Sequence, residues 1–358
     1  MGGAIDVVIT WVDGDDPVHR FGRAEALAAA DLPQARRLNG TEETRFANSG
    51  EIYYSIASIL KYAPFVRRIF IVTDNQVPPH LEDFTALGIC DPGRIQVVDH
   101  RTIFAGYEEY LPTYNSLTIE TMIWRIPGLS ETFLYLNDDV FLNAPLSPAD
   151  LVTDEGKLVI HGELRSVYPL LLKGLLRRIR TRYRLTKKSY GAHFKTAQVL
   201  SARLCRLSRY IQVGHTPHVL RRSVFEAFFR SHPDAVHRQI APRFRTIEQF
   251  LPVGLSHHAG LAAGTVELRP LDSSAYLKPS NSGEERLNVL RREGTLYGCA
   301  QSLERFSADR RRLFRSVMHA KLEGFLPASV CGHLEWLDAR RTPKPASGET
   351  ARLIRVAA

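Results

Sequence analysis

The chain has little cysteine and no long apolar run. Its four cysteines are scattered along 358 residues without a Cys-x-x-Cys pair, so we expect free thiols in a reducing compartment. No run of 18 apolar residues occurs, and the sequence therefore predicts no transmembrane helix. The first residues have neither a basic segment nor an apolar signal core, so nothing directs export. Together these absences predict a cytoplasmic protein.

Acidic residues are missing from one long stretch, because residues 164–225 contain 15 Lys or Arg and no Asp or Glu. Residues 1–163 carry 12 basic and 24 acidic residues, a net charge of −12, whereas residues 164–358 carry 35 and 14, a net charge of +21. An acidic part suits a metal-bound nucleotide, and a basic part suits a polyanion such as nucleic acid, an anionic membrane or a phosphate-containing polymer. Since no recognisable RNA- or DNA-binding motif is present, we expect no nucleic acid partner.

The basic stretch contains a leucine-rich segment with Leu171, Leu175 and Leu176 at helical spacing and cations around them. This pattern is typical of an interfacial helix on anionic lipid. The alternatives are a core helix with a solvated basic face and a surface that grips a phosphodiester polymer. We predict four regions, which are an acidic core over residues 1–163, a basic helical insertion over 164–212, the remainder of the core over 213–305, and a C-terminal helix with a disordered tail over 306–358.

Apolar stretches typical of buried strands run into acidic residues at four places. They are Ile5–Trp11 before Asp13, Arg68–Thr73 before Asp74, Arg94–Val98 before Asp99, and Phe133–Leu136 before Asn137-Asp138-Asp139. Helical periodicity over residues 51–62 and 113–125 lies between them. This order predicts an α/β fold with a Rossmann-like, mostly parallel sheet flanked by helices, in which ligands bind at the carboxyl ends of the strands.

The pair Asp138 and Asp139 is the strongest local signal for a site. Two adjacent carboxylates at a strand end suit a hydrated divalent cation that carries a phosphorylated substrate. A solvated turn is the alternative, because Asn and Asp are ordinary turn residues. The recurrence of acids at Asp13 and Asp74 favours the site.

The predicted helix over residues 113–125 adds three candidates. Asn115 and Ser116 fall in its first turn, where exposed N–H groups and the helix dipole attract anions. Glu120 sits beside the apolar face of the helix and is either functional or solvated.

Several blocks of the chain resemble the Stealth family of sugar-1-phosphate transferases, which includes bacterial capsule polymerases. The first is IDVVITWVDGDD, residues 5–16, and the second runs from Glu51 to Leu142 and contains LPTYNSLTIE and NDDVFL. The third consists of TPHVL, residues 216–220, with FRTIEQ, residues 244–249. A fourth, weaker block is LYGCAQS, residues 296–302. Together the blocks cover about half of the chain in the order of the family.

The resemblance implies a glycosyltransferase-A-like fold and transfer of a hexose-1-phosphate, in particular an N-acetylhexosamine-1-phosphate. The donor would be a nucleotide diphosphate sugar such as a UDP-sugar, and the acceptor a hydroxyl of a saccharide or phosphosaccharide. Nucleoside monophosphate would be released, in capsular or cell-surface polysaccharide synthesis, with the protein in the cytoplasm or peripheral on the inner face of the plasma membrane. The rival function is a metal-dependent glycosyltransferase, which would release nucleoside diphosphate.

Carried over by motif, the resemblance implies five catalytic residues, which are Glu120, Asp138, Asp139, His218 and Arg245. The paired acids would hold Mg²⁺ or Mn²⁺ on Asp138 and Asp139. The substrate-binding candidates come from the strand ends and from the first turn of the predicted helix, and they are Asp13, Asp74, Asn115, Ser116 and Asn137. We expect Arg245 to pair with phosphate and His218 to act as general base, because its unperturbed pKa lies near neutrality; Asp139 is the alternative base.

Overall fold

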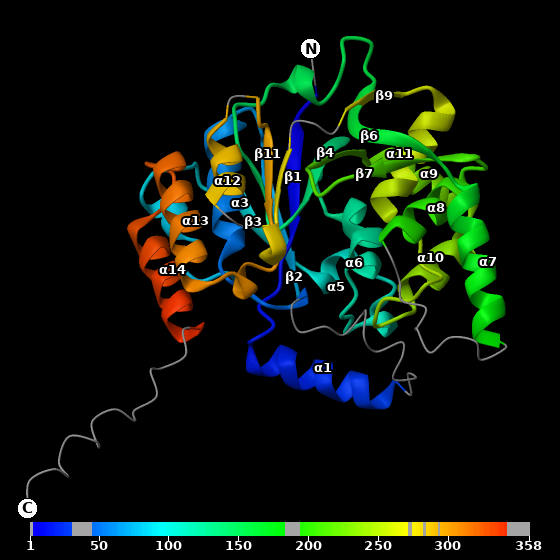
Figure 1. Ribbon diagram of the computed structural model, residues 1–358, viewed down its shortest axis with the longest axis horizontal. Helices are drawn as coiled ribbons and strands as arrows, with labels where there is room; N and C mark the ends of the chain where they lie inside the picture. Colours follow the sequence, from blue (N-terminus) through cyan, green and yellow to red (C-terminus); the bar gives the residue numbers. More distant parts are fainter. Residues whose placement is uncertain are drawn as a thin grey trace, which may run out of the picture.

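The computed structural model describes residues 3–30, 45–182, 194–270, 274–281, 284–292 and 294–341. Its central sheet has the order β3-β2-β1-β4-β8 (Figure 1). The four strands β1 (Ile5–Thr10), β2 (Ile69–Thr73), β3 (Ile95–Asp99) and β4 (Thr132–Asn137) are parallel, and β8 (His218–Arg221) lies antiparallel to β4. The predicted α/β fold with a mostly parallel sheet flanked by helices is therefore confirmed.

The inner strands are almost continuously apolar because helices cover both faces of the sheet. Successive side chains of a strand point to opposite faces. Val7 and Ile9 of β1 pack on the side of α3 (Glu51–Tyr62), whereas Val8 packs on the side of α6 (Ser116–Met122) and the following η3 (Ile123–Arg125). All three of these side chains are fully buried. The strand can bury both of its faces only in this position between two helical layers.

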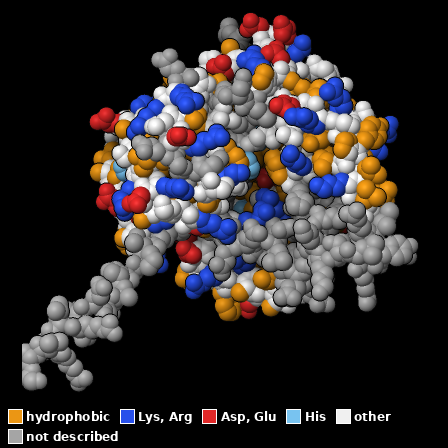
Figure 2. Space-filling model, viewed as in Figure 1, with side chains coloured by type: hydrophobic (Ala, Val, Ile, Leu, Met, Phe, Trp, Pro, Cys, Tyr) orange, Lys and Arg blue, Asp and Glu red, His pale blue; other side chains and the backbone are white. Residues whose placement is uncertain are grey.

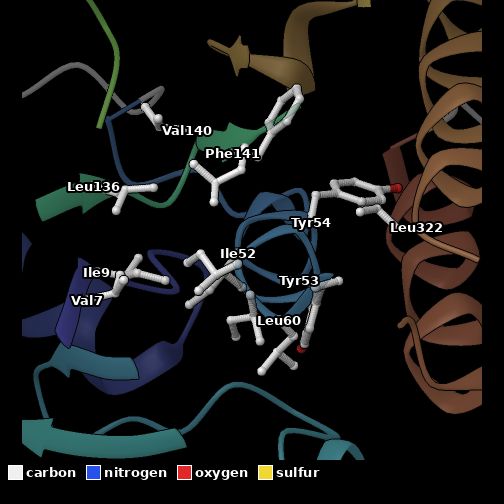
Figure 3. Close-up of a cluster of buried hydrophobic side chains, with 14 of the residues drawn as sticks. Val7, Ile9, Ile52, Tyr53, Tyr54, Leu60, Leu136, Val140, Phe141 and Leu322 are labelled. Carbon is white, nitrogen blue, oxygen red and sulfur yellow. The ribbon is translucent and has the colours of Figure 1, made fainter. Parts of the chain in front are cut away.

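One side of the core is built around α3, as Figure 3 shows. Ile52 and Leu60 of the helix face Val7 and Ile9 of β1, and the ring of Tyr54 on the other side of the helix points toward Leu322. Burying each such apolar side chain contributes about 1.5–3 kcal/mol. An outer layer of α13 (Ala308–Lys321) and α14 (Ala328–Arg341) covers the far side of α3 (Figure 1). The structure thus joins the first and the last parts of the described chain.

Two smaller sheets complete the fold. In the first, β5 (Val140–Leu142) pairs antiparallel with β11 (Tyr297–Ala300), which pairs parallel with β10 (Ser274–Leu277). In the second, β6 (Leu158–Ser166) pairs antiparallel with β7 (Arg209–Val213) and parallel with β9 (Val266–Arg269). The apolar stretch around the Asp138-Asp139 pair therefore forms two strands in two different sheets, with the carboxylates in the turn between them.

The basic insertion lies between β6 and β7. Its described helices are α7 (Tyr168–Arg182) and α8 (Phe194–Leu204). The predicted boundary between residues 163 and 164 falls inside β6, which continues to Ser166. Of the two helices, α8 is packed into the protein against α11 (Pro252–Ala263), whereas α7 exposes its leucines. The insertion thus combines a buried helix and an exposed one.

The remaining elements are short or peripheral. Helix α1 (Pro17–Ala29) lies below the carboxyl ends of the central strands in Figure 1, and α9 (Arg222–Ser231) is followed directly by α10 (Pro233–Ile240). The short helices are α4 (Asp83–Ala86), α5 (His100–Ile103), η2 (Glu108–Tyr110), η4 (Pro148–Asp150), η5 (Pro279–Asn281), α12 (Glu284–Leu287), η6 (Asn288–Arg291) and η7 (Leu303–Arg305). The predicted disordered tail beyond residue 341 lies outside the described residues. Within the described ranges, every helix is too short or too polar to span a membrane.

Candidate active site

A cavity of about 630 Å³ opens where the parallel strands of the central sheet end. One wall consists of residues at or just after the strand ends, namely Trp11, Asp74, His100 and the 137–139 turn. The segments 214–218 and 245–249 form a second wall, and residues 278–279 and 301–305 contribute a third. Figure 2 shows Lys and Arg side chains around a hollow near the middle of this face. The cavity therefore collects residues from both the acidic and the basic parts of the chain.

Eight of the ten residues predicted from the sequence line this cavity. They are Asp74, Ser116, Glu120, Asn137, Asp138, Asp139, His218 and Arg245. The other two, Asp13 and Asn115, are absent from the described residues that outline it. Residues separated by more than a hundred positions are thus brought to one place.

Asp13 and Asn115 have local structural partners instead. A side-chain oxygen of Asp13 accepts from the N–H of Asp15 at 3.1 Å, which holds the turn after β1. Asn115 caps α6 by accepting from the N–H of Leu117, and its amide nitrogen donates to Gln249 Oε1 at 2.9 Å. The helix begins at Ser116, three residues after the predicted start, because the Asn115 cap fixes its first turn. Asp and Asn at a chain turn serve this capping role as readily as ligand binding.

The Asp138-Asp139 turn is held by the small sheet of β5 and β11. Ala300 donates its N–H to the backbone carbonyl of Asp139 at 2.9 Å, and the thiol of Cys299 donates to Asp139 Oδ2 with an Sγ–Oδ2 distance of 3.5 Å. The second carboxylate oxygen, Oδ1, is buried and has no hydrogen-bond partner among the described residues. An orphaned buried carboxylate oxygen is costly unless a ligand satisfies it.

A third carboxylate, Glu51 at the start of α3, belongs to the same acidic cluster. Burial raises the pKa of Glu51 to about 7. Burial, followed by the charges of Asp139 and Glu51, holds the pKa of Asp138 well above its ordinary value, and burial also raises the pKa of Asp139. Carboxylates so close together in a buried place resist losing their protons unless a positive charge joins them.

These carboxylates fit one kind of metal ion. In the described part of the chain, no group of three or more His, Cys, Asp or Glu side chains is arranged to hold a metal by itself. Mg²⁺ is usually held by one or two carboxylates together with substrate phosphates and water. The free Oδ1 of Asp139 and the neighbouring Asp138 are the one or two protein carboxylates that such a Mg²⁺ site needs.

Two sets of hydrogen bonds lie in the cavity wall, one that begins at Arg245 and one at the end of β1. The guanidinium of Arg245 donates to the hydroxyl of Ser116, which donates to Glu120 Oε1 at 3.1 Å. The hydroxyl of Tyr135 lies 3.0 Å from Thr10 Oγ1 and donates to Asn137 Oδ1 at 2.9 Å. Burial raises the pKa of Glu120 to about 6, although the charge of Arg245 opposes this shift. Glu120 is therefore a buried acid that positions Ser116 and, through it, Arg245.

Two histidines from the 214–218 segment line the cavity. His218 is the residue of β8 that pairs with Tyr135 of β4, and burial lowers its pKa to about 3. Its pKa in the folded protein is therefore lower than the unperturbed value on which its expected role as general base was based, and that role stays a prediction. The imidazole stays neutral and so retains a nitrogen that can accept a proton.

The second histidine, His215, was missed from the sequence. Its ring is stacked between Tyr276 at 4.8 Å and Phe194 at 5.5 Å, as measured between ring centroids. Burial lowers the pKa of His215 and raises the pKa of Asp139, and the charge interaction between the two side chains partly opposes both shifts. The available signal was its place three residues before His218 in the same HTPH segment.

Other missed residues come from the C-terminal part of the described chain. Lys278, Glu304 and Arg305 line the cavity opposite the central sheet. Glu304 and Arg305 reach it because β5 pairs with β11, which places residues 297–305 beside the Asp138-Asp139 turn. Lys278 directly follows β10, which pairs with β11 in the same sheet. The weak fourth block, LYGCAQS, was the only sequence signal for this wall.

The chain carries two conserved regions of the Stealth family. Residues 3–30 match the model of Stealth protein CR1, conserved region 1, and residues 45–160 match that of Stealth protein CR2, conserved region 2. The resemblance inferred from the first two sequence blocks is thereby confirmed, whereas the third and fourth blocks lie outside both matches. The second match contains Glu51, Glu120 and the 137–139 turn, so most of the acidic wall of the cavity lies in one conserved region.

Several relatives of the chain are named as polysaccharide phosphotransferases. The chain is 34% identical over 261 residues to an exopolysaccharide phosphotransferase of Streptomyces coelicolor, covering 73% of this chain and 26% of the relative. It is 34% identical over 247 residues to a capsular polysaccharide phosphotransferase of Actinobacillus pleuropneumoniae (68% and 61%), and 33% identical over 246 residues to one of Haemophilus influenzae (67% and 60%). The chain thus spans between about a quarter and three-fifths of the length of these relatives.

Two solved structures that resemble the chain are glycosyltransferases. The WbbM bifunctional enzyme in its apo form matches with a TM-score of 0.47 and 12% identity, covering 96% of this chain and 52% of that one. The galactosyltransferase LgtC with donor and acceptor sugar analogs matches with a TM-score of 0.39 and 12% identity, covering 96% and 98%. Both TM-scores lie below 0.5, so the fold assignment rests on the strand order described above.

Proposed function

We propose that this protein transfers an N-acetylhexosamine-1-phosphate from a UDP-sugar to a hydroxyl of a saccharide or phosphosaccharide, in the synthesis of a capsular or other cell-surface polysaccharide. The observation that carries the proposal is the meeting of Asp138 and Asp139 with Arg245 in one cavity at the carboxyl ends of parallel strands. The names of the relatives support the reaction class.

Arg245 is the residue that we assign to the donor phosphates. A guanidinium presents its N–H groups in a planar fork that matches two phosphate oxygens. Among the described residues, the fork makes one hydrogen bond within the cavity wall, to Ser116. Lys278 and Arg305 add further positive charge to the lining of the cavity. These cations would together neutralise a bound diphosphate.

The reaction is a substitution at phosphorus. The acceptor hydroxyl oxygen forms a bond to the β-phosphorus of the donor while the bond from that phosphorus to the bridging oxygen breaks. The bridging oxygen leaves with the bonding electron pair as part of nucleoside monophosphate, and the hydroxyl proton passes to a base. Negative charge grows on the phosphoryl oxygens and on the leaving group, so positioning and electrostatic stabilisation dominate the rate.

We propose that His218 is the base that accepts the proton of the acceptor hydroxyl, with Asp139 as the alternative base. His218 lines the cavity and is neutral, as a base must be before it reacts. Binding of an anionic donor nearby raises the pKa of an imidazole, because the charge favours the protonated form. Asp139 is already more basic than an ordinary carboxylate, since burial raises its pKa.

We further propose that Asp138 and Asp139 hold Mg²⁺ or Mn²⁺ together with the donor phosphates. Such an ion would neutralise charge on the phosphoryl oxygens and on the departing nucleotide. The free Oδ1 of Asp139 is the observation that supports this assignment.

The released nucleotide tests the function. The full chain is incubated with UDP-sugars, Mg²⁺ and a saccharide acceptor, and the products are separated by ion-exchange chromatography. We expect nucleoside monophosphate together with a phosphodiester signal in the ³¹P spectrum of the product. Release of nucleoside diphosphate with formation of a glycosidic bond would identify the protein as a metal-dependent glycosyltransferase and overturn the proposal.

A further inference from the structure

The helix α7 turns its apolar face to solvent. Its apolar residues Tyr168, Leu171, Leu172, Leu175 and Leu176 recur at positions i, i+3, i+4, i+7 and i+8, which places them on one face of the helix. In a water-soluble domain that face ordinarily packs against the core. Here the five side chains are between 39% and 62% exposed. We name these five residues the leucine stripe.

The attachment of α7 explains why the leucine stripe stays outside. At the start of the helix, Val167 is buried with Val199, Ala202 and Tyr210, and Leu170 packs against this small cluster. Leu170 thus points inward, and the stripe residues on either side of it point elsewhere. The β6-β7 pair holds the base of the helix to the protein. The exposure of the stripe therefore follows from how the helix is anchored.

The surroundings of the leucine stripe are positively charged. Lys173 is exposed on α7 itself, and Lys195, Arg203, Arg206 and Arg209 are exposed on α8 and the turn that leads to β7. The sequence from residue 164 to residue 225 contains no acid that could offset them. Figure 2 shows hydrophobic side chains with Lys and Arg among them at the right-hand edge, where α7 lies in Figure 1.

We propose that the leucine stripe and the cations around it dock the protein on an anionic membrane surface. A helix lying in the interface buries its apolar face at the boundary of head groups and acyl chains, while Lys and Arg pair with lipid phosphates. The apolar face and the cations that such binding needs are both present on α7 and its surroundings. A polyanionic polymer would use the cations but leave the leucines in water, and a second copy of the chain would bring its own cations to the same face. The charge and the apolar stripe together therefore fit lipid better than either.

Sedimentation with vesicles tests the proposal directly. The full chain is mixed with vesicles of equal parts phosphatidylglycerol and phosphatidylcholine, and separately with pure phosphatidylcholine. We expect binding to the anionic vesicles that weakens as salt rises, and little binding to the neutral ones. Changing Leu171, Leu175 and Leu176 to Ser is expected to weaken binding to anionic vesicles at least about tenfold, because apolar burial supplies much of the affinity.

A matched control uses exposed apolar residues elsewhere. Val77 and Leu87 are each 62% exposed and lie far along the chain from the basic stretch. The double change Val77→Ser and Leu87→Ser should leave vesicle binding unchanged. Because all these side chains are exposed, circular dichroism and turnover on a short soluble acceptor should match the wild type in both variants. A separate change, Lys173→Glu, should weaken binding to anionic vesicles and leave the response to neutral ones as it is.

Three outcomes would overturn the proposal. The first is vesicle binding by the triple serine variant that equals that of the wild type. The second is absence of vesicle binding by the wild type together with salt-sensitive binding to dextran sulfate, a soluble polyanion, that the serine changes leave intact. The third is a wild-type dimer in analytical ultracentrifugation without lipid that the serine changes convert to a monomer, since a second copy would then cover the stripe.

Discussion

The acidic residues 1–163 and the basic residues 164–358 meet in the cavity, and they supply opposite kinds of charge to it. Among the described residues that line it, the carboxylates at positions 51, 74, 120, 138 and 139 come from the first region and Glu304 comes from the second. The second region supplies Arg245, Lys278 and Arg305, and the first supplies Arg45. A site for a metal-bound anion needs both signs of charge. Most of its carboxylates therefore come from the first region and most of its cations from the second.

The two regions also differ in where their charges lie. Three carboxylates of the first region, Glu51, Asp138 and Asp139, form a cluster in which burial raises the pKa of each. In the part of the basic stretch whose side chains the structure describes, exposed cations lie on α7, on α8 and from there to the start of β7, and they are Lys173, Lys195, Arg203, Arg206 and Arg209. Buried charge acts at short range on a bound ligand, whereas exposed charge attracts partners from a distance and is screened by salt. The comparison therefore assigns metal binding to the acidic cluster of the first region and long-range attraction to the exposed basic stretch of the second, whereas His218 and Arg245 of the second region act inside the cavity.

The largest loss of turnover is expected from Asp139→Asn, which changes the acidic side of the cavity. It removes the charge at the free Oδ1, so we expect turnover to fall about a thousandfold or more while the fold is retained. Steady-state turnover at saturating Mg²⁺ measures the effect, and circular dichroism checks the fold. Turnover close to that of the wild type would contradict the assignment of the site to the Asp138-Asp139 turn.

The next largest effect is expected from His218→Ala. Loss of the proton acceptor should lower turnover about a hundredfold or more and leave donor affinity nearly unchanged, because the base acts on the acceptor hydroxyl. Isothermal titration with the donor, alongside turnover, separates the two quantities. If donor affinity falls as far as turnover does, His218 binds the donor and the proton goes elsewhere.

Arg245→Ala breaks the basic side of the cavity. We expect donor affinity to fall roughly tenfold to a hundredfold, since charge-assisted hydrogen bonds to phosphate are present in the ground state as well. Arg243→Ala is the matched control, because Arg243 is exposed, lies two residues away and is not among the described residues of the cavity wall. Equal losses from the two changes would mean that the phosphate assignment of Arg245 is wrong.

Much of the sheet and of the acidic wall could be predicted from the sequence for a physical reason. Parallel strands end at a common edge, so residues that follow separate strands meet without any long-range information. This is why the 137–139 turn and Asp74 were identified. The same rule fails at Asp13 and Asp99, which lie at or just after strand ends but are not among the described residues of the cavity wall. An acid at the end of a strand can instead hold a turn or cap a helix, as Asp99 does for α5.

The rest depended on contacts that no local pattern specifies. Residues 301–305 reach the cavity through pairing of β5 with a strand more than 150 residues later. His215 comes close to Asp139 from the segment before β8, which pairs with β4. The low pKa of His218 comes from burial, which its motif does not encode. Periodicity identified the leucine stripe of α7 but not which way it faces, since an amphipathic helix has the same spacing against a core and in solvent.

A smaller effect is expected on stability from Glu51→Gln. The folded-state pKa of Glu51 is raised from 4.5 to about 7, so the folded chain holds a proton that the unfolded chain loses between these values. Without divalent cation, wild-type stability from this group should therefore be full below pH 4.5 and fall as pH rises to 7, by about 3 kcal/mol at most. The Gln variant lacks this loss. Denaturant unfolding at pH 5 and pH 8 measures it, and a stability difference between the two proteins that is the same at both pH values contradicts the assignment.

The smallest effect is expected from Asp13→Asn, which sharpens the comparison between acids that line the cavity and acids that only follow a strand. The side-chain oxygen of Asp13 that accepts from the N–H of Asp15 is retained as an amide oxygen in this variant, and Asp13 is not among the described residues of the cavity wall. Donor affinity and turnover should therefore change by no more than about twofold, within the range of a surface substitution. The matched change is Asp74→Asn at the end of β2, where the carboxyl does line the cavity and burial and Asp99 raise its pKa. We expect Asp74→Asn to weaken donor binding clearly more than Asp13→Asn does. The opposite ranking in parallel titrations would show that the loop after β1 contacts the donor and that the cavity wall extends to Asp13 when the donor is bound.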